Sequence, residues 1–325
     1  MADRISNYIK KFLISVSVPV VLFLILLIFY HKSVTLSSLV LWAQLAIAPA
    51  ILAWGVCFSL KVGMWDFSVG GVVYLSAIMG GNLAIQSGNE VIGVIIFCPL
   101  VGAVLGLLTG LVFRYLKIPS IIVSVGMLLV YECITQYVYG GNGVQLSNKV
   151  FTIYSFPQNV IIGAAAFLII YILYNFTQYG YHVRAVGNGI SAAKMSGINI
   201  DKVRILCFVS GGLFAGLYAV MMIGSSGVVI PVKDMSSMSM VFEGVICVFI
   251  ALALERQCNL IIGVFIGALT VQIIKGGILA TGFPSMYQQC IVALFLLIFM
   301  SASTRGRELM RYLRIRRLER QNNHT

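Results

Sequence analysis

The chain has 325 residues, of which 60% are hydrophobic and only 10% are charged, and its mean hydropathy is +0.99. Because soluble globular domains usually carry about 25% charged residues, this composition excludes an ordinary water-soluble protein and indicates one that lies in a bilayer. The net charge of +12 would suit a nucleic-acid partner only if the basic residues formed one solvated face. They lie between apolar blocks, so we expect no nucleic acid.

A helix that crosses about 30 Å of hydrocarbon needs roughly 20 apolar residues. In chain order, ten blocks of about that length occur at 12–30, 36–57, 67–87, 91–114, 119–139, 158–176, 205–223, 236–254, 259–279 and 284–302. No small-residue cleavage site follows the first block, so we predict a retained helix. Pro19, Pro49 and Pro99 predict kinks within their blocks. The predicted fold is an all-α, polytopic membrane protein of about ten helices, in a single domain over residues 1–325.

Basic residues test this count, because they collect on the cytoplasmic side of membrane proteins. With ten crossings both termini share one side, and that side receives all of the 22 Lys and Arg residues except Lys32, Lys149, Lys233 and Lys275. We therefore predict ten crossings with both termini in the cytoplasm. The basic tail, 304–325, then serves to hold this orientation and to attract anionic lipid.

The connection between the sixth and seventh blocks is polar and rich in small residues, unlike the other connections. Asn188 or Ser191 can cap a short helix there, and Gly197 can end it in a left-handed turn. Asn199 or Asp201 can cap the next span. We predict a short helix that lies along the cytoplasmic membrane face.

This connection, 181–204, is interpreted as a docking segment, because small side chains let another protein approach the backbone closely. The alternative is a surface helix that merely joins two spans. The residues expected to make the contact are Gly187, Asn188, Ala192, Ala193, Ser196, Gly197 and Ile198.

Four segments of the chain together match a known pattern. They are WDFSVGGVVYLSA at 65–77, LKIPSIIVSVGM at 116–127, RAVGNGISAAKMSGINIDKVR at 184–204 and GFPSMYQQ at 282–289. In this order they resemble the ribose-type permeases of ABC importers, within the ribose and branched-chain amino acid permease family. The chain departs from that family where Glu255 and Arg256 replace a loop that is usually rich in glycine.

The resemblance implies a multi-pass permease subunit in the cell membrane of a prokaryote, working as a dimer with itself or with a paralogous permease. Two cytoplasmic ATPase subunits would bind ATP and Mg and dock on the 181–204 segment, and an extracytoplasmic binding protein would deliver the solute. The implied cargo is a monosaccharide such as ribose, xylose or galactose. A nucleoside or a signalling furanose remains an open alternative.

Two pairs of short segments suggest an internal repeat. EVIGVIIF at 90–97 is similar to NLIIGVFI at 259–266, and KIPSIIV at 117–123 is similar to GFPSMYQ at 282–288. In the ten-helix topology the two halves face opposite ways, which is the inverted arrangement common in transporters.

Catalytic motifs are absent from the sequence. It has no G-x-x-x-x-G-K-[ST] loop to cradle ATP phosphates, so hydrolysis would belong to a partner. It also lacks HExxH, GxSxG and a Cys and His pairing, and its seven cysteines lie singly. We expect no catalytic residue, cofactor, metal site or disulfide in this chain.

Charges within the apolar blocks are costly in hydrocarbon unless they face a cavity or a counter-charge. Asp66 can cap the third helix or act in transport, whereas Lys275 can reach the outer headgroups. Glu132 and Glu243 suit a pore or a subunit interface. If Asp66 joined them in an ion site, the chain would be an ion-coupled secondary transporter, the main alternative of another class.

Neutral polar groups in the blocks could line a path for a hydroxylated solute or join helices to one another. With the charged residues, the candidates for the path are Asp66, Ser68, Asn82, Glu132, Gln136, Glu243, Gln272 and Gln288.

Overall fold

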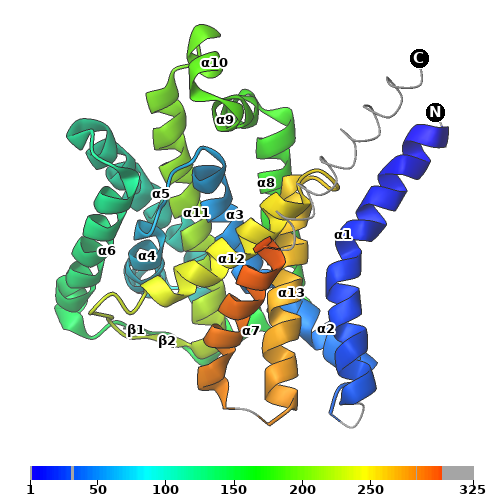
Figure 1. The fold of residues 1–325 in the computed structure, drawn as a ribbon. Coiled ribbons are helices and arrows are strands. Elements are labelled where there is room, and N and C mark those ends of the chain that lie inside the picture. Colours follow the sequence, from blue (N-terminus) through cyan, green and yellow to red (C-terminus); the bar gives the residue numbers. More distant parts are fainter. Residues whose placement is uncertain (1, 31–32, 283, 302–325) are drawn as a thin grey trace, which may run out of the picture.

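The structure is a computed structural model that describes residues 2–30, 33–282 and 284–301, and nearly all of its elements are helices (Figure 1). The longer helices are α1 (Ala2–Phe29), α2 (Leu36–Leu45), α3 (Ile47–Lys61), α4 (Ser68–Gln86), α5 (Glu90–Leu116), α6 (Ser120–Tyr137), α8 (Gln158–Phe176), α11 (Ile200–Ser226), α12 (Met238–Leu254), α13 (Leu260–Ala280) and a last helix, Gln288–Ser301. The short elements are η1 (Val138–Gly141), β1 (Val144–Gln145), η2 (Asn148–Val150), α7 (Phe151–Tyr154), α9 (Gln178–Asn188), α10 (Ile190–Met195), β2 (Val228–Val229) and η3 (Ser285–Tyr287). The basic tail, 304–325, lies outside the described residues.

Each of the ten predicted blocks contains a helix, but the helices differ in length. Among the described residues, six helices are long and apolar enough to cross a membrane: α4, α5, α6 with its extension to Gly141, α8, α11 and α13. The pair α2 and α3 makes a seventh if it crosses as one bent span, and the apolar parts of α1, α12 and the last helix are shorter. The all-α membrane fold is therefore confirmed, whereas ten crossings stay a prediction.

The block predicted at 36–57 is broken between α2 and α3, which meet at an angle of 41°. Pro49 lies in the first turn of α3 and has no N–H, so it cannot donate to the Leu45 carbonyl as a helical residue would. The kink predicted from this proline is observed.

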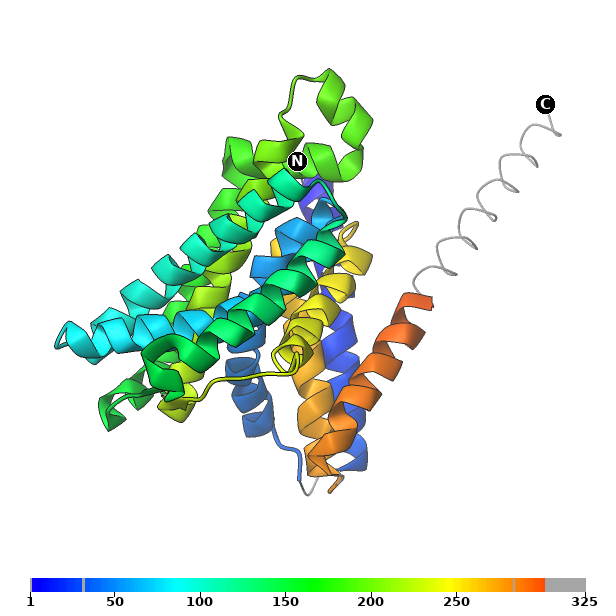
Figure 2. The ribbon, with the colours of Figure 1, turned by 90° about the vertical axis from the view of Figure 1, so that its left-hand side faces the viewer.

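The centre of the bundle is formed by α3, α4 and α11. Of the six long spans α4 is the most enclosed, with 72% of its apolar window buried, while α8 is the least, with 28%. Figure 2 shows α5 and α6 running beside α4 on one side of the molecule, and both helices pack against it. The outer helices therefore offer apolar side chains to lipid, and α4 lies against protein.

α5 and α11 pack backbone against backbone along a line of glycines. Gly102 and Gly106 of α5 face Gly212 and Gly216 of α11, and a Cβ on Gly212 would lie 2.2 Å from the Gly102 carbonyl oxygen. A larger side chain at this line would force the two helices apart. Glycines four residues apart on both helices form the small-xxx-small pattern of closely packed membrane helices.

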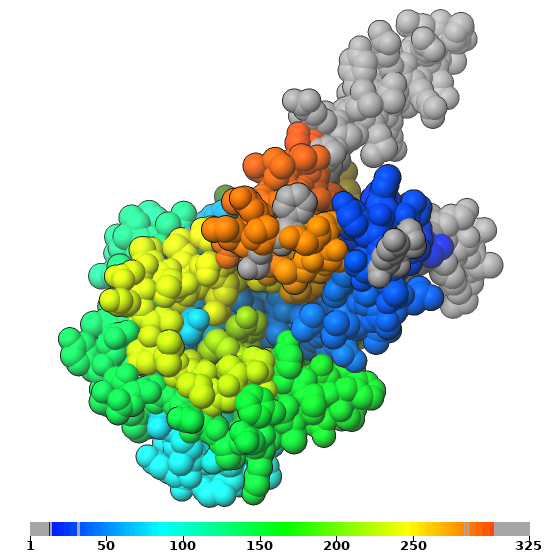
Figure 3. Space-filling model, turned by 90° about the horizontal axis from the view of Figure 1, so that it is seen from below, coloured from blue at the N-terminus to red at the C-terminus, as the bar shows by residue number. Residues whose placement is uncertain are grey.

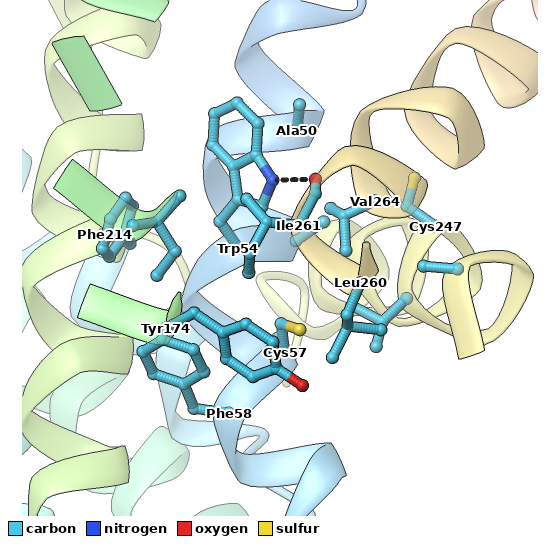
Figure 4. Close-up of a cluster of buried hydrophobic side chains, with 14 of the residues drawn as sticks. Ala50, Trp54, Cys57, Phe58, Tyr174, Phe214, Cys247, Leu260, Ile261 and Val264 are labelled. Carbon is cyan, nitrogen blue, oxygen red and sulfur yellow. Dashed lines mark hydrogen bonds between the residues drawn. The ribbon is translucent and has the colours of Figure 1, made fainter. Parts of the chain in front are cut away.

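α3 joins the centre to α8 and α13 through aromatic side chains (Figure 4). The indole Nε1 of Trp54 donates a hydrogen bond of 3.0 Å to the carbonyl of Ile261, which satisfies the polar atom of a buried ring. Phe58 stacks on Tyr174 of α8, with ring centroids 5.8 Å apart. These contacts fix α3 against both neighbours.

The two short strands tie two loops together at the end of the molecule opposite α9 and α10 (Figure 1). β1 and β2 pair antiparallel, with Val144 opposite Val229. The side-chain amide of Asn82 in α4 donates a hydrogen bond of 3.1 Å to the carbonyl of Gly143, next to β1. This end is therefore held together by backbone pairing across loops.

The two helices of the suggested repeat, α5 and α13, run in opposite directions (Figure 2). Each begins after an asparagine whose side chain caps it: Asn89 accepts from the N–H of Ile92, and Asn259 accepts from the N–H of Ile261. These features agree with an inverted repeat, whose extent over whole halves stays a prediction.

Candidate functional site

The predicted docking segment forms two helices, α9 and α10, which stand at one end of the bundle (Figure 1). The Thr177 hydroxyl caps α9 by accepting from the Gly180 N–H at 3.2 Å. α9 then continues to Asn188, and Gly189 separates it from α10. The prediction that Asn188 or Ser191 caps a single short helix is therefore wrong, because the run from Gln178 to Asn188 is itself helical.

The end of α10 is as predicted. Gly197 has φ +78°, the Gly197 N–H donates to the Lys194 carbonyl at 3.0 Å, and the Ile198 N–H donates to the Ala193 carbonyl at 3.1 Å. These two bonds form a Schellman motif, which needs a residue that tolerates the left-handed conformation. Asn199 then caps α11 by accepting from the Lys202 N–H at 3.1 Å.

The small residues of the docking segment serve two different purposes. Ala193 is only 3% exposed and packs in the chain's own core, and a Cβ on Gly187 would lie 2.5 Å from the Lys61 carbonyl oxygen. Their small size is explained by contacts within the chain. Ile198 is half-buried. The side chains presented outward, here called the α10 surface, are Asn188, Ile190, Ala192, Met195, Ser196 and Gly197.

Sequence reasoning missed Ile190 and Met195 of the α10 surface. Met195 is 84% exposed and Ile190 is 45% exposed. Two large apolar side chains within a short polar loop would have been the signal, since apolar groups exposed close together can mark a surface that a partner covers.

The atypical Glu255 forms an ion pair with Lys61, the last residue of α3. Lys61 also contacts Gly187 of α9 through its carbonyl. The turn between α12 and α13, the end of α3 and the docking segment therefore meet at one place. This junction replaces the glycine-rich loop that the family resemblance implied.

Asp66 and Ser68 lie together at the start of α4 and are both buried. The Oδ1 of Asp66 accepts from the Ser68 N–H at 3.1 Å and from the Ser68 hydroxyl at 2.5 Å. Its Oδ2 points toward Gly211 of α11, where a Cβ would lie 3.3 Å away. Phe67, not Asp66, is the N-cap residue of α4, but the Asp66 carboxylate still holds the first turn from the position before it. This contact favours a structural role of Asp66 over a transport role.

Glu132 of α6 is buried and holds the loop that precedes α12. Its Oε1 accepts from the N–H and the hydroxyl of Ser237, at 3.0 and 2.6 Å, and its Oε2 accepts from the Met235 N–H at 2.9 Å. Met235 and Asp234 both have positive φ, near 59°, which is strained for residues other than glycine. Gln136 supports the same loop by donating to the Val232 carbonyl at 2.9 Å.

Glu243 of α12 meets Gln272 and Lys275 of α13. The Nζ of Lys275 lies 2.6 Å from the Oε2 of Glu243, and the Nε2 of Gln272 donates to the Oε1 at 3.2 Å. The side chains of Lys275 and Glu243 are 22% and 24% exposed, so the pair is accessible on one side. The ion pair favours Glu243 as the partner of Lys275 over the predicted reach to the outer headgroups. We call Glu243, Gln272 and Lys275 the polar triad.

The remaining path candidates lie apart from the triad. Asn82 donates to the carbonyls of Ile78 and Gly143, so it joins α4 to the loop at β1. Gln288 begins the last helix, and no hydrogen bond described here joins it to the triad. Of the eight candidates, the structure therefore pairs Asp66 with Ser68 and Glu243 with Gln272, and it joins Glu132 and Gln136 of α6 to the same loop before α12.

The end of the molecule opposite α9 and α10 is hollowed. Figure 3 views this end and shows a recess between the yellow and orange segments, which carry α12 and α13, and the blue segment of α2 and α3.

Among the described residues no three His, Cys, Asp or Glu side chains gather where they could hold a metal ion, and the seven cysteines are free thiols. The polar groups can therefore offer hydrogen bonds and paired charges.

Long apolar helices around a buried centre define an integral membrane protein, and a partly buried polar triad lies between two of these helices. The model of the family described as "Branched-chain amino acid transport system / permease component" matches residues 38–300. The match covers most of the chain, which belongs to this family, and the resemblance predicted from its four segments is confirmed.

Named relatives are similar to the chain over most of its length. The fructose import permease protein FrcC of Rhizobium meliloti is 28% identical over 276 residues, covering 78% of this chain and 74% of that protein. The autoinducer 2 import system permease protein LsrC of Yersinia pseudotuberculosis serotype IB is 25% identical, covering 82% and 76%. The galactose/methyl galactoside import permease protein MglC of Haemophilus influenzae is 26% identical, covering 74% and 78%. No solved structure matches the chain.

Proposed function

We propose that the chain is the membrane-spanning permease subunit of an ABC importer and moves a monosaccharide into the cytoplasm. The observation that carries this proposal is the similarity, over about three quarters of each protein, to permeases named for fructose, galactose and autoinducer 2 import. A signalling furanose or a nucleoside is the alternative cargo, since both also present a hydroxylated ring.

The polar triad supports a neutral, hydroxylated solute. Glu243 and Lys275 cancel each other's charge, and with Gln272 they offer both acceptors and donors at a partly exposed position. A charged solute would have to break this ion pair, whereas hydroxyl groups can share its hydrogen bonds. We propose the triad as part of the solute path.

We propose that two ATPase subunits carry ATP and Mg and dock on the α10 surface, and that a binding protein delivers the solute at the opposite end. A second copy of the chain or a paralogue completes the pore. The start of α1 lies at the same end as α9 and α10 (Figure 1), which supports a cytoplasmic N-terminus. We further propose ten crossings with the C-terminus on the same side, on the strength of the basic residues that collect there. The membrane is then the inner membrane of a prokaryote.

The contacts of the carboxylates count against an ion-coupled secondary transporter. An ion site made by Asp66, Glu132 and Glu243 would need the three to converge. Each is instead bound by different partners: Ser68, the loop at Met235 and Ser237, and Lys275. ATP-driven import therefore explains the geometry better.

Reconstitution tests the proposal. The chain with its ATPase and binding protein, placed in liposomes, should take up a labelled sugar only when ATP is supplied on the ATPase side. A panel of ribose, xylose, galactose, fructose and a nucleoside identifies the cargo. Accumulation by the chain alone, driven by a proton or sodium gradient without ATP, would reject the importer and favour the secondary transporter.

A further inference from the structure

A basic cavity of about 240 Å³ lies where the end of α5 meets the start of α11, at the same end of the molecule as α9 and α10. Its volume is far above the ~10–15 Å³ that one water needs, so it has room for a polyatomic group. The residues that line it are Phe113, Arg114, Lys117, Ile118, Asp201 and Arg204. None of them belongs to the polar triad or to the α10 surface.

The cavity has more cations than carboxylates. Arg114, Lys117 and Arg204 line it against the single carboxylate of Asp201, and none of the described ion pairs uses these four residues. The guanidinium of Arg204 lies 5.9 Å from the centre of the Phe113 ring, its Nε is buried without a hydrogen-bond partner, and Arg204 itself lines the cavity. No described ion pair neutralises its charge, so an anion in the cavity would supply a counter-charge.

An exposed apolar stripe on α5 relates the cavity to the part of the surface that would lie in the membrane. α5 exposes an apolar stripe at Ile92, Ile96, Leu100, Val104 and Leu108, four residues apart, which is the side that faces lipid. The stripe leads along the helix toward its end. The cavity therefore opens where the lipid-facing surface passes into the basic, polar end of the bundle.

The end of α5 and the turn to α6 continue this surface around the cavity. Tyr115 is 79% exposed, and Leu116 and Ile118 are also exposed, although each is next to a cationic residue of the cavity wall. A molecule with a phosphate and acyl chains fits this arrangement, because the phosphate can enter the cavity while the chains follow the apolar stripe. A small soluble anion would use only the cavity.

We propose that this cavity binds the phosphate of an anionic phospholipid headgroup in the cytoplasmic leaflet. Basic pockets between membrane helices on that side are suited to such headgroups. Arg204 donates to the phosphate from the first turns of α11, and Arg114 and Lys117 donate from the end of α5. A bound lipid thereby clamps the start of α11, which follows α10 and closes the docking segment, to α5.

The test measures lipid-dependent thermal stability of the purified full chain in detergent. Dioleoylphosphatidylglycerol, dioleoylphosphatidylcholine and sodium phosphate are titrated separately, and the concentration at half of the stabilisation is recorded. Arg114→Gln and Lys117→Gln change exposed residues, so they should fold normally. Lys202→Gln is the matched control, since it removes the same charge from the first turn of α11 but outside the cavity.

We expect the anionic lipid to stabilise the wild-type chain at lower concentration than the zwitterionic lipid. Each cavity variant should raise the half-maximal concentration of the anionic lipid about fivefold, and Lys202→Gln less than twofold. Equal effects of all three variants would overturn the proposal in favour of general surface charge. If sodium phosphate stabilised the chain at the same concentration as the anionic lipid, the ligand of the cavity would be a soluble phosphate and not a lipid headgroup. Loss of ATPase co-purification with unchanged lipid dependence would assign the cavity to the ATPase.

Discussion

Replacing Lys275 by methionine should destabilise the chain, because it leaves the Glu243 carboxylate between α12 and α13 without its cation. The Lys275 Nζ lies 2.6 Å from Glu243, and the only other described partner of that carboxylate is the neutral amide of Gln272. Methionine keeps the length and apolar stem of the side chain, so the variant removes the charge with little loss of packing. The charge itself is therefore what the substitution tests.

The size of the effect follows from the exposure of the two side chains. An ion pair in full contact with solvent contributes about 0–1 kcal/mol, whereas removing one partner of a fully buried pair costs about 3–5 kcal/mol. Lys275 and Glu243 are 22% and 24% exposed, which lies between these limits. We expect a loss of about 2 kcal/mol for Lys275→Met. The double variant with Glu243→Gln should recover at least half of it, because no unpaired charge remains.

Thermal unfolding of the purified wild-type chain and of the single and double variants in detergent measures these losses. A loss of about 2 kcal/mol lowers the midpoint of thermal unfolding by roughly 4 °C. Lys233→Met is the control, since Lys233 is an exposed lysine outside any described ion pair and should shift the midpoint by less than about 1 °C. Additive losses in the double variant would refute the coupling. Sugar uptake by the stable double variant then separates two roles: lost uptake supports the solute path, and normal uptake makes the pair structural only.

Three further experiments test the packing, the topology and the docking surface. Gly212→Ala should cost about 1–3 kcal/mol in thermal unfolding, since α5 must move by about 1 Å, whereas Gly126→Ala, with open space around it, should cost nothing. In a cysteine-free background, a membrane-impermeant thiol reagent should label Lys149→Cys but not Ser191→Cys in intact cells, and the reverse would invert the topology. Ala192→Glu should reduce co-purification of the ATPase and uptake, and normal values of both would remove the docking role.

The helices were predictable from the sequence because the thickness of the hydrocarbon fixes how many apolar residues a span needs. Which helix lies at the centre was not predictable from hydropathy, since lipid-facing and protein-facing positions are equally apolar. α4 is the clearest case, because it is 72% buried but its mean hydropathy is below that of the lipid-facing α5. A usable signal was present in the spacing of Gly102, Gly106 and Gly212, Gly216, which marks the contact of α5 with α11.

The roles of the polar residues were harder to predict, because they depend on partners far away in the chain. Glu132 and Glu243 look alike as carboxylates inside apolar blocks. Glu132 is bound by Ser237, 105 residues away, and serves a loop, whereas Glu243 is bound by a lysine whose side chain is 22% exposed. The cap at Asn199 and the turn at Gly197 were predicted correctly because the geometry of helix ends is local.

The junction at Lys61 gives a physical reason for the unusual Glu255. A glycine-rich turn between α12 and α13 would be free to move relative to α3, whereas the Glu255 ion pair fixes this turn to the last residue of α3. The same residue contacts Gly187 of α9 at a distance that leaves no room for a side chain. A force applied to the α10 surface therefore reaches α3 and the turn together. Because α12 and α13 also carry the polar triad, we expect the docking segment and the proposed solute path to move as parts of one unit.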